Sequence, residues 1–116
     1  MVPLMRVHVD PLIDAAHANV DVVAEAQKSA RAAEQAASDA ERWGRLAVRA
    51  TDHRSAAMWA ELTASAAVRC DWHCGDAHTL APGSTADNEA HAVLSSARLY
   101  ARHAKGAAEA LAKVPT

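Results

Sequence analysis

Cysteine and histidine side chains are concentrated in one short stretch of the chain, residues 70–78. Within it, Cys70, Cys74 and His78 are spaced four residues apart, which places them on one ridge if the stretch is helical. Thiolates and imidazoles are ligands that zinc and copper accept. The spacing therefore makes a zinc or copper site one hypothesis for this segment. Burial of the cysteines as small apolar side chains is the alternative.

A turn predicted at residues 81–84 brings a further ligand into reach, because Pro and Gly end the helix there and Ser84 can cap the next one. If the two helices run antiparallel, equal distances from this turn set Cys74 level with His91, and His78 level with Asn88. Without such a site we expect no cofactor. The candidate metal ligands are Cys70, Cys74, His78 and His91, with His73 as an alternative to His78.

Patterns typical of enzymes are poorly represented in the chain. The Glu-x-x-His pairs of di-iron bundles do not occur, since Asp14 and Asn88 stand three residues before His17 and His91. No base, nucleophile and orienting group converge, and the four Gly leave few turns for an oxyanion hole. We therefore expect a non-enzymatic protein, with a small enzyme that has a pocket between its helices as an alternative.

The composition limits the classes of partner. A chain of 116 residues fits one domain, and its net charge of -2 gives no excess of Lys and Arg for binding nucleic acid. We find neither the apolar run of a signal peptide nor the ~18 apolar residues of a membrane span. Cysteines four apart in a helix do not suit a disulfide, so we expect a cytoplasmic protein without membrane contact.

Signals for helix starts and ends divide most of the chain into predicted helices. Asp10 followed by Pro11 is typical of a helix start, and the alternation before it predicts a short extended arm over residues 1–10. Helices are expected over 11–50, to about 80 and to about 114, with any break in the first near Ser38 or Thr51. We predict an all-α fold, in which residues 11–116 form one up-and-down helical bundle of three long or four shorter helices.

Small residues form a seam along the first helix, spaced alternately four and three apart. This seam consists of Ala26, Ala30, Ala33, Ala37, Ala40, Gly44 and Ala47. Because about a quarter of the chain is Ala and the core must be thin, we expect the seam to pack against a second copy or another helical protein. The last helix has its apolar face at Ala86, Ala90, Val93, Ala97, Tyr100, Ala104, Ala107, Leu111 and Val114, and the middle one at Trp59, Ala66, Cys70, His73, Ala77 and Leu80.

Trp43, Trp59 and Trp72 are the only Trp residues of the chain. In an Ala-rich core, large aromatic side chains fill space, and that is the role we expect for them. An exposed Trp would instead indicate an interface, where this residue type often contributes much of the binding energy.

Val9, Asp10 and Pro11, leading into an Ala-rich helix with Trp43 and Gly44 near mid-chain, resemble the small helical-hairpin proteins exported by type VII secretion. That family is named for a Trp-x-Gly turn, and the resemblance implies dimers of helical hairpins. Here Trp43 and Gly44 are adjacent, and Ala104 stands four residues after Tyr100, where the family has an acidic residue.

The leading hypothesis from sequence is a non-enzymatic helical interaction protein that acts as a homo-oligomer or as a subunit of a larger complex. A metal-binding helical protein that uses the Cys70 and Cys74 ridge is the first alternative, and a small enzyme is the second.

Overall fold

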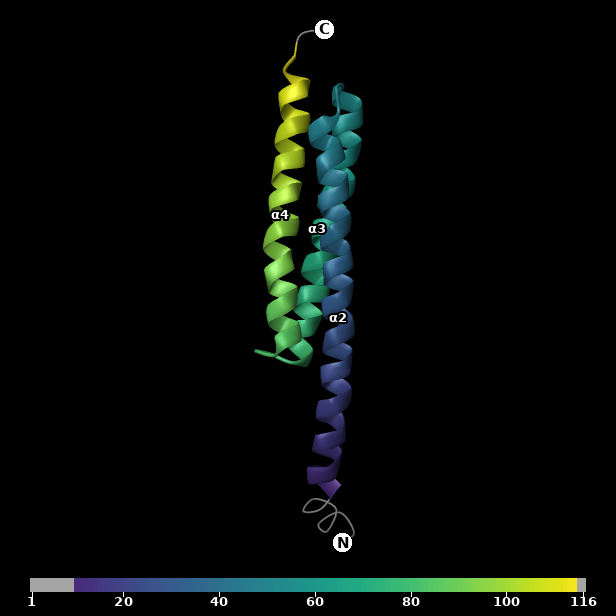
Figure 1. Ribbon diagram of the computed structural model, residues 1–116, viewed down its shortest axis with the longest axis vertical. Helices are drawn as coiled ribbons and strands as arrows, with labels where there is room; N and C mark the ends of the chain where they lie inside the picture. Colours follow the sequence, from purple (N-terminus) through teal and green to yellow (C-terminus); the bar gives the residue numbers. More distant parts are fainter. Residues whose placement is uncertain (1–9, 115–116) are drawn as a thin grey trace.

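The computed structural model describes residues 10–114, with side chains described from residue 21 onward. Three helices, α2 (Asp10–Arg49), α3 (His53–Leu80) and α4 (Thr85–Ala112), run up, down and up side by side (Figure 1). The described residues contain no strand. The fold is therefore the predicted all-α bundle, with three helices rather than four over residues 10–114. The predicted arm over 1–10 lies outside the described residues, except that Asp10 is the first residue of α2.

The first turn lies at the second of the two predicted breaks. α2 passes through Ser38 without interruption and ends at Arg49. Asp52 then caps α3, because its carboxylate accepts a hydrogen bond of 2.8 Å from the backbone N–H of Ser55. This bond stabilises the ionised acid and lowers the pKa of Asp52.

The second turn also follows its sequence signals. Gly83 has a φ of 75°, a conformation that glycine adopts without steric cost. The Ser84 hydroxyl accepts a hydrogen bond of 3.2 Å from the backbone N–H of Asp87, which caps the start of α4. Two capped turns thus hold three helices antiparallel to their chain neighbours.

The core between the helices is made almost entirely of small side chains. Its largest fully buried members are only Thr63, Cys70 and Cys74. The buried cluster otherwise consists of Leu94 and Ala residues, namely Ala26, Ala30, Ala33, Ala36, Ala37, Ala40, Ala66, Ala67, Ala77, Ala86, Ala90 and Ala97. Small side chains let the helix backbones approach closely, so the bundle is narrow.

α2 is longer than its two neighbours. It has 40 residues against 28 in each of α3 and α4. At ~1.5 Å per residue, about 18 Å of helix extends past the α3–α4 turn, and Figure 1 shows α2 continuing beyond that turn. Among the described side chains of α2, burial begins at Ala26.

In the two shorter helices, the residues predicted to be buried are buried over part of the helix and exposed toward its C-terminal end. In α4, Ala86, Ala90 and Ala97 are buried as expected, but Leu94 and Ala108 are buried in place of the predicted Val93 and Ala107. Val114 lies beyond the end of α4 and is 57% exposed. Leu80, expected on the inner face of α3, is 36% exposed. A straight helix drifts by ~20° per heptad against a strict seven-residue repeat. Over four turns or more, this drift rotates the predicted residues out of the core, and residues next to them in the sequence are buried instead.

Gly44 lies at a close approach of α2 to α4. A Cβ added there would lie 3.1 Å from the Cβ of Tyr100 and 3.3 Å from its carbonyl oxygen. We expect Gly44→Ala to push the helices apart and to lower the free energy of unfolding by about 1–3 kcal/mol in chemical denaturation.

The matched control is Gly106→Ala in α4, because a Cβ added there has nothing within 4 Å. This variant should gain about 0.5–1 kcal/mol from the better helix propensity of Ala. Equal effects of the two substitutions would contradict the close approach at Gly44.

Candidate functional site

Cys70 and Cys74 lie on the inner face of α3, where they are 0% and 1% exposed. Both are free thiols. Burial raises the pKa of Cys70 to about 11, with smaller contributions from Cys74 and Asp71, and burial also raises the pKa of Cys74. Both side chains are therefore protonated at neutral pH and pack as small apolar groups.

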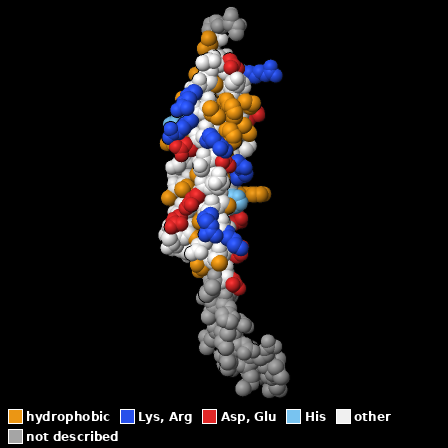
Figure 2. Space-filling model, turned by 45° about the vertical axis from the view of Figure 1, so that its right-hand side comes forward, with side chains coloured by type: hydrophobic (Ala, Val, Ile, Leu, Met, Phe, Trp, Pro, Cys, Tyr) orange, Lys and Arg blue, Asp and Glu red, His pale blue; other side chains and the backbone are white. Residues whose placement is uncertain are grey.

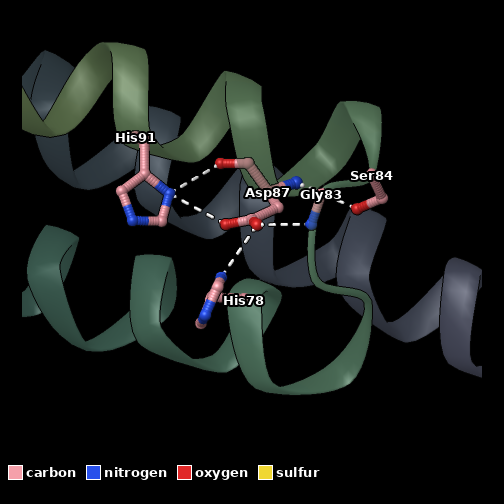
Figure 3. A network of polar contacts seen from close by, with 5 residues as sticks. All are labelled: His78, Gly83, Ser84, Asp87 and His91. Carbon is pink, nitrogen blue, oxygen red and sulfur yellow. Dashed lines mark hydrogen bonds and ion pairs between the residues drawn. The ribbon is translucent and has the colours of Figure 1, made fainter.

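The two predicted histidine ligands lie elsewhere, on either side of a buried acid (Figure 3). His78 from α3 donates a hydrogen bond of 2.9 Å from Nδ1 to Oδ2 of Asp87 in α4. Nδ1 of His91 lies 2.8 Å from the other carboxylate oxygen and donates to the Asp87 carbonyl oxygen at 2.9 Å. Asp87 is 5% exposed, whereas the side chains of His78 and His91 are 61% and 55% exposed.

The Asp87 carboxylate is held ionised by its surroundings. The hydrogen bond from His78 and a second bond of 2.8 Å from the Gly83 N–H lower the pKa of Asp87, in opposition to its burial. Because its partners come from α3, the turn and α4, this one side chain joins both helices to the loop between them. We name His78, Gly83, Asp87 and His91 the Asp87 cluster.

Counting residues outward from the turn correctly predicted that His78 lies beside the first turn of α4, but it did not predict that Asp87 is the residue it contacts. It placed His78 beside Asn88, whereas Asp87 is the residue that turns inward to meet His78. The two imidazole rings stand edge to face, with centroids 5.9 Å apart. A signal for Asp87 was present, since an acid three residues after the capping Ser84 is part of a common helix-start pattern.

The four predicted metal ligands are thus divided between two environments, the thiols in the core and the imidazoles at the surface. In the part of the chain that the structure describes, no group of three or more His, Cys, Asp or Glu side chains is placed to hold a metal ion. His73 lies apart from the Asp87 cluster, beside Asp39 and Arg69 at the α2–α3 side. Zinc or copper binding by this set stays a prediction.

The seven seam residues of α2 are all buried inside a single copy of the chain. The close approach that they allow is made to α3 and α4, as the contact of Gly44 with Tyr100 and Thr63 illustrates. A second copy would have to displace these helices to reach the seam. The structure therefore places the seam in the intramolecular core.

The three Trp residues have two different environments. Trp43 and Trp59 stack between α2 and α3 with ring centroids 5.4 Å apart and planes inclined by 10°, and Arg42 lies over Trp43 at 4.5 Å. Trp72 is 76% exposed. Trp43 and Trp59 are thus partly buried at the edge of the core rather than inside it as predicted, and Trp72 is exposed.

Large apolar side chains are exposed on α3, outside the stripe of buried residues that packs against the other helices. They are Met58, Leu62, Val68, Trp72 and Leu80, which are 36–76% exposed, and we name them the outward face of α3. Figure 2 shows apolar side chains open to solvent among charged ones. This face was not predicted from sequence: Trp72 and Leu80 were expected in the core, and Met58, Leu62 and Val68 were assigned no role.

An open hollow of about 630 Å³ lies between α3 and α4, beside Val68. Its lining consists of Ala64, Ala67, Val68, Ser95, Arg98, Ala101 and Arg102. This lining has no His, Cys, Asp or Glu side chain, so the hollow offers apolar contact and two positive charges rather than acid–base chemistry.

Comparison of this chain with protein families, curated proteins and solved structures found no match to any of them. Trp43 and Gly44, which carry the resemblance to the exported helical hairpins, lie within α2, and the turn follows after Arg49. Among the helices described here, none has the length and hydropathy needed to cross a membrane.

We predict that replacing Asp87 with Asn lowers the melting temperature at neutral pH, because His78 and Gly83 lose their charged acceptor. The pKa of Asp87 is lower in the folded state, so its stabilisation is complete above the unfolded pKa of about 3.9 and is lost as the pH falls through the folded value. Between neutral pH and strong acid, the difference between wild type and Asp87→Asn should therefore shrink. Asp76→Asn is the matched control, since Asp76 is exposed and forms no ion pair with a described residue.

The thiols provide a second prediction. Iodoacetamide should modify Cys70 at least about a hundredfold more slowly in the native protein than in urea, since its pKa of about 11 is some two units above the ordinary 9.0 and the side chain is buried. A chelator should not change the native rate. Protection that disappears on adding the chelator would contradict simple burial and support the zinc or copper hypothesis.

Proposed function

We propose that this chain is a non-enzymatic interaction protein that acts as a homo-oligomer or as a subunit of a larger complex, with the outward face of α3 as its contact surface. One observation carries the proposal: five large apolar side chains of α3 are exposed, while its buried positions are Ala, Thr and Cys. Single exposed apolar residues are ordinary in a monomer, but several along one face are typical of a binding surface.

The energetics favour covering this face. Removing apolar surface from water gains roughly 25 cal/mol per Å², and a Trp side chain contributes on the order of 200 Å² when fully buried. Trp72 is 76% exposed and Val68 is 62% exposed, so most of that gain is still available to a partner. The Ala residues in the core have far less surface to bury.

The spacing of the outward face fits a helical partner. Met58, Ser65 and Trp72 are seven residues apart, and Leu62 and Val68 flank this line. Side chains that repeat every seven residues form a stripe along a helix, which matches the stripe of a second helix. Ser65, exposed at the centre, is small enough to allow the two backbones to approach.

The partner that this surface supports is a second copy or another helical protein, rather than nucleic acid or a membrane. Cys70 and Cys74 are free thiols, and free thiols persist in reducing compartments, so we propose the cytoplasm as its location.

The prediction is that wild-type protein in solution is heavier than the 12.2 kDa chain and that Trp72→Ser makes it lighter. The dissociation constant should rise by at least about tenfold, since truncating a central interface Trp costs on the order of 2 kcal/mol or more. Light scattering over a range of concentrations measures this. Because Trp72 makes little contact within the bundle, the melting temperature of a dilute sample should not fall.

Leu99→Ser in α4 is the matched control, since Leu99 is 44% exposed but lies outside the outward face of α3. It should leave the mass of the native species unchanged. A wild-type protein that is monomeric at every concentration, with a melting temperature independent of concentration, would contradict self-association. If a different helical protein copurifies instead, Trp72→Ser should release it and Leu99→Ser should not.

A further inference from the structure

A small hollow between α2 and α4 collects basic side chains from both helices. It has a volume of about 150 Å³ and is lined by Gly44, Arg45, Val48, Arg49, Tyr100 and His103. The lining includes two guanidinium groups, one imidazole and one phenol, and none of its residues is acidic. The hollow lies between a different pair of helices from the α3–α4 hollow, shares no lining residue with it and uses no residue of the outward face of α3.

The hollow is a product of the close approach at Gly44. Arg45 and Arg49 are one helical turn apart on α2, and Tyr100 and His103 are one turn apart on α4. Because a Cβ at Gly44 would touch Tyr100, only glycine lets the two turns come this close. Hydrogen-bond donors from two helices therefore border the same small hollow.

Charge within the hollow is only partly neutralised. Glu41 pairs with Arg45 at 2.7 Å from the preceding turn, and both side chains are about half exposed. The pKa of Arg45 is raised first by its hydrogen bond with Tyr100 and then by Glu41, so this guanidinium is firmly charged. Arg49 forms no ion pair with any acidic residue that the structure describes, which leaves its positive charge available to a ligand.

We propose that this hollow binds a phosphate group, with Arg45, Arg49 and His103 as donors and Tyr100 as a further hydroxyl contact. Guanidinium groups bind phosphate oxygens through two parallel N–H bonds, with a geometry that a Lys does not offer. The donors stand on two sides of the hollow, so they suit an anion with oxygens in several directions better than a planar carboxylate. A volume of 150 Å³ accommodates such a group without opening the helices.

The test is titration with inorganic phosphate, followed by calorimetry and by NMR shifts of the Arg45, Arg49 and His103 amides. Arg49→Gln should weaken binding by about tenfold, because it removes one charge-assisted contact. Glu41→Gln should strengthen binding, because it frees Arg45 from its present partner. Arg31→Gln, an exposed position on α2 outside the hollow, is the control and should bind as wild type does.

Equal weakening by Arg49→Gln and Arg31→Gln would show general charge attraction and would overturn the site. Acetate that binds as tightly as phosphate would overturn the choice of ligand. Titration with O-phosphoserine distinguishes the source, since tighter binding than inorganic phosphate indicates a phosphate ester and weaker binding indicates the free ion. Trp72→Ser should bind phosphate normally, so the outcome is independent of the proposed interaction function.

Discussion

The close packing of small side chains is the constraint on which the rest of this molecule depends. Ala residues fill the space between three long helices, and at Gly44 even a methyl group would touch Tyr100. Small side chains bury little apolar area each, so the bundle gains its stability from many contacts at short range rather than from a few large side chains. A narrow core also leaves no space for large residues.

The exposed apolar surface follows from that constraint. Trp43 and Trp59 stack at the edge of the core, while Met58, Val68 and Trp72 are exposed outside the buried stripe of α3. In a wider bundle such residues would fill the interior. Here they remain available to a partner, so the same close packing that holds the chain together also produces the surface through which we propose that it acts.

Polar side chains fix the helix ends and the relative position of α3 and α4, which the Ala-rich core does not define by itself. Asp52 and Ser84 cap the two later helices, and Asp87 joins α3, the Gly83 turn and α4 through a single buried carboxylate. Apolar packing between Ala faces is not strongly directional, so sliding of one helix along another costs little. The bond from His78 of α3 to Asp87 of α4 opposes such sliding, because it forms only when the two helices have one relative position.

Local signals along the chain were enough to predict the helices and their turns, since Asp52, Pro82, Gly83 and Ser84 act through backbone geometry that needs no tertiary contact. The sequence also identified the small-residue seam, because a seam is a periodicity along one helix. Only the tertiary structure decided that α3 and α4 cover this seam, that Asp87 rather than Asn88 meets His78, and that Arg45 and Arg49 lie beside His103. Each of these depends on the rotation of one helix about its axis relative to another, and a repeat that drifts by ~20° per heptad does not fix that rotation.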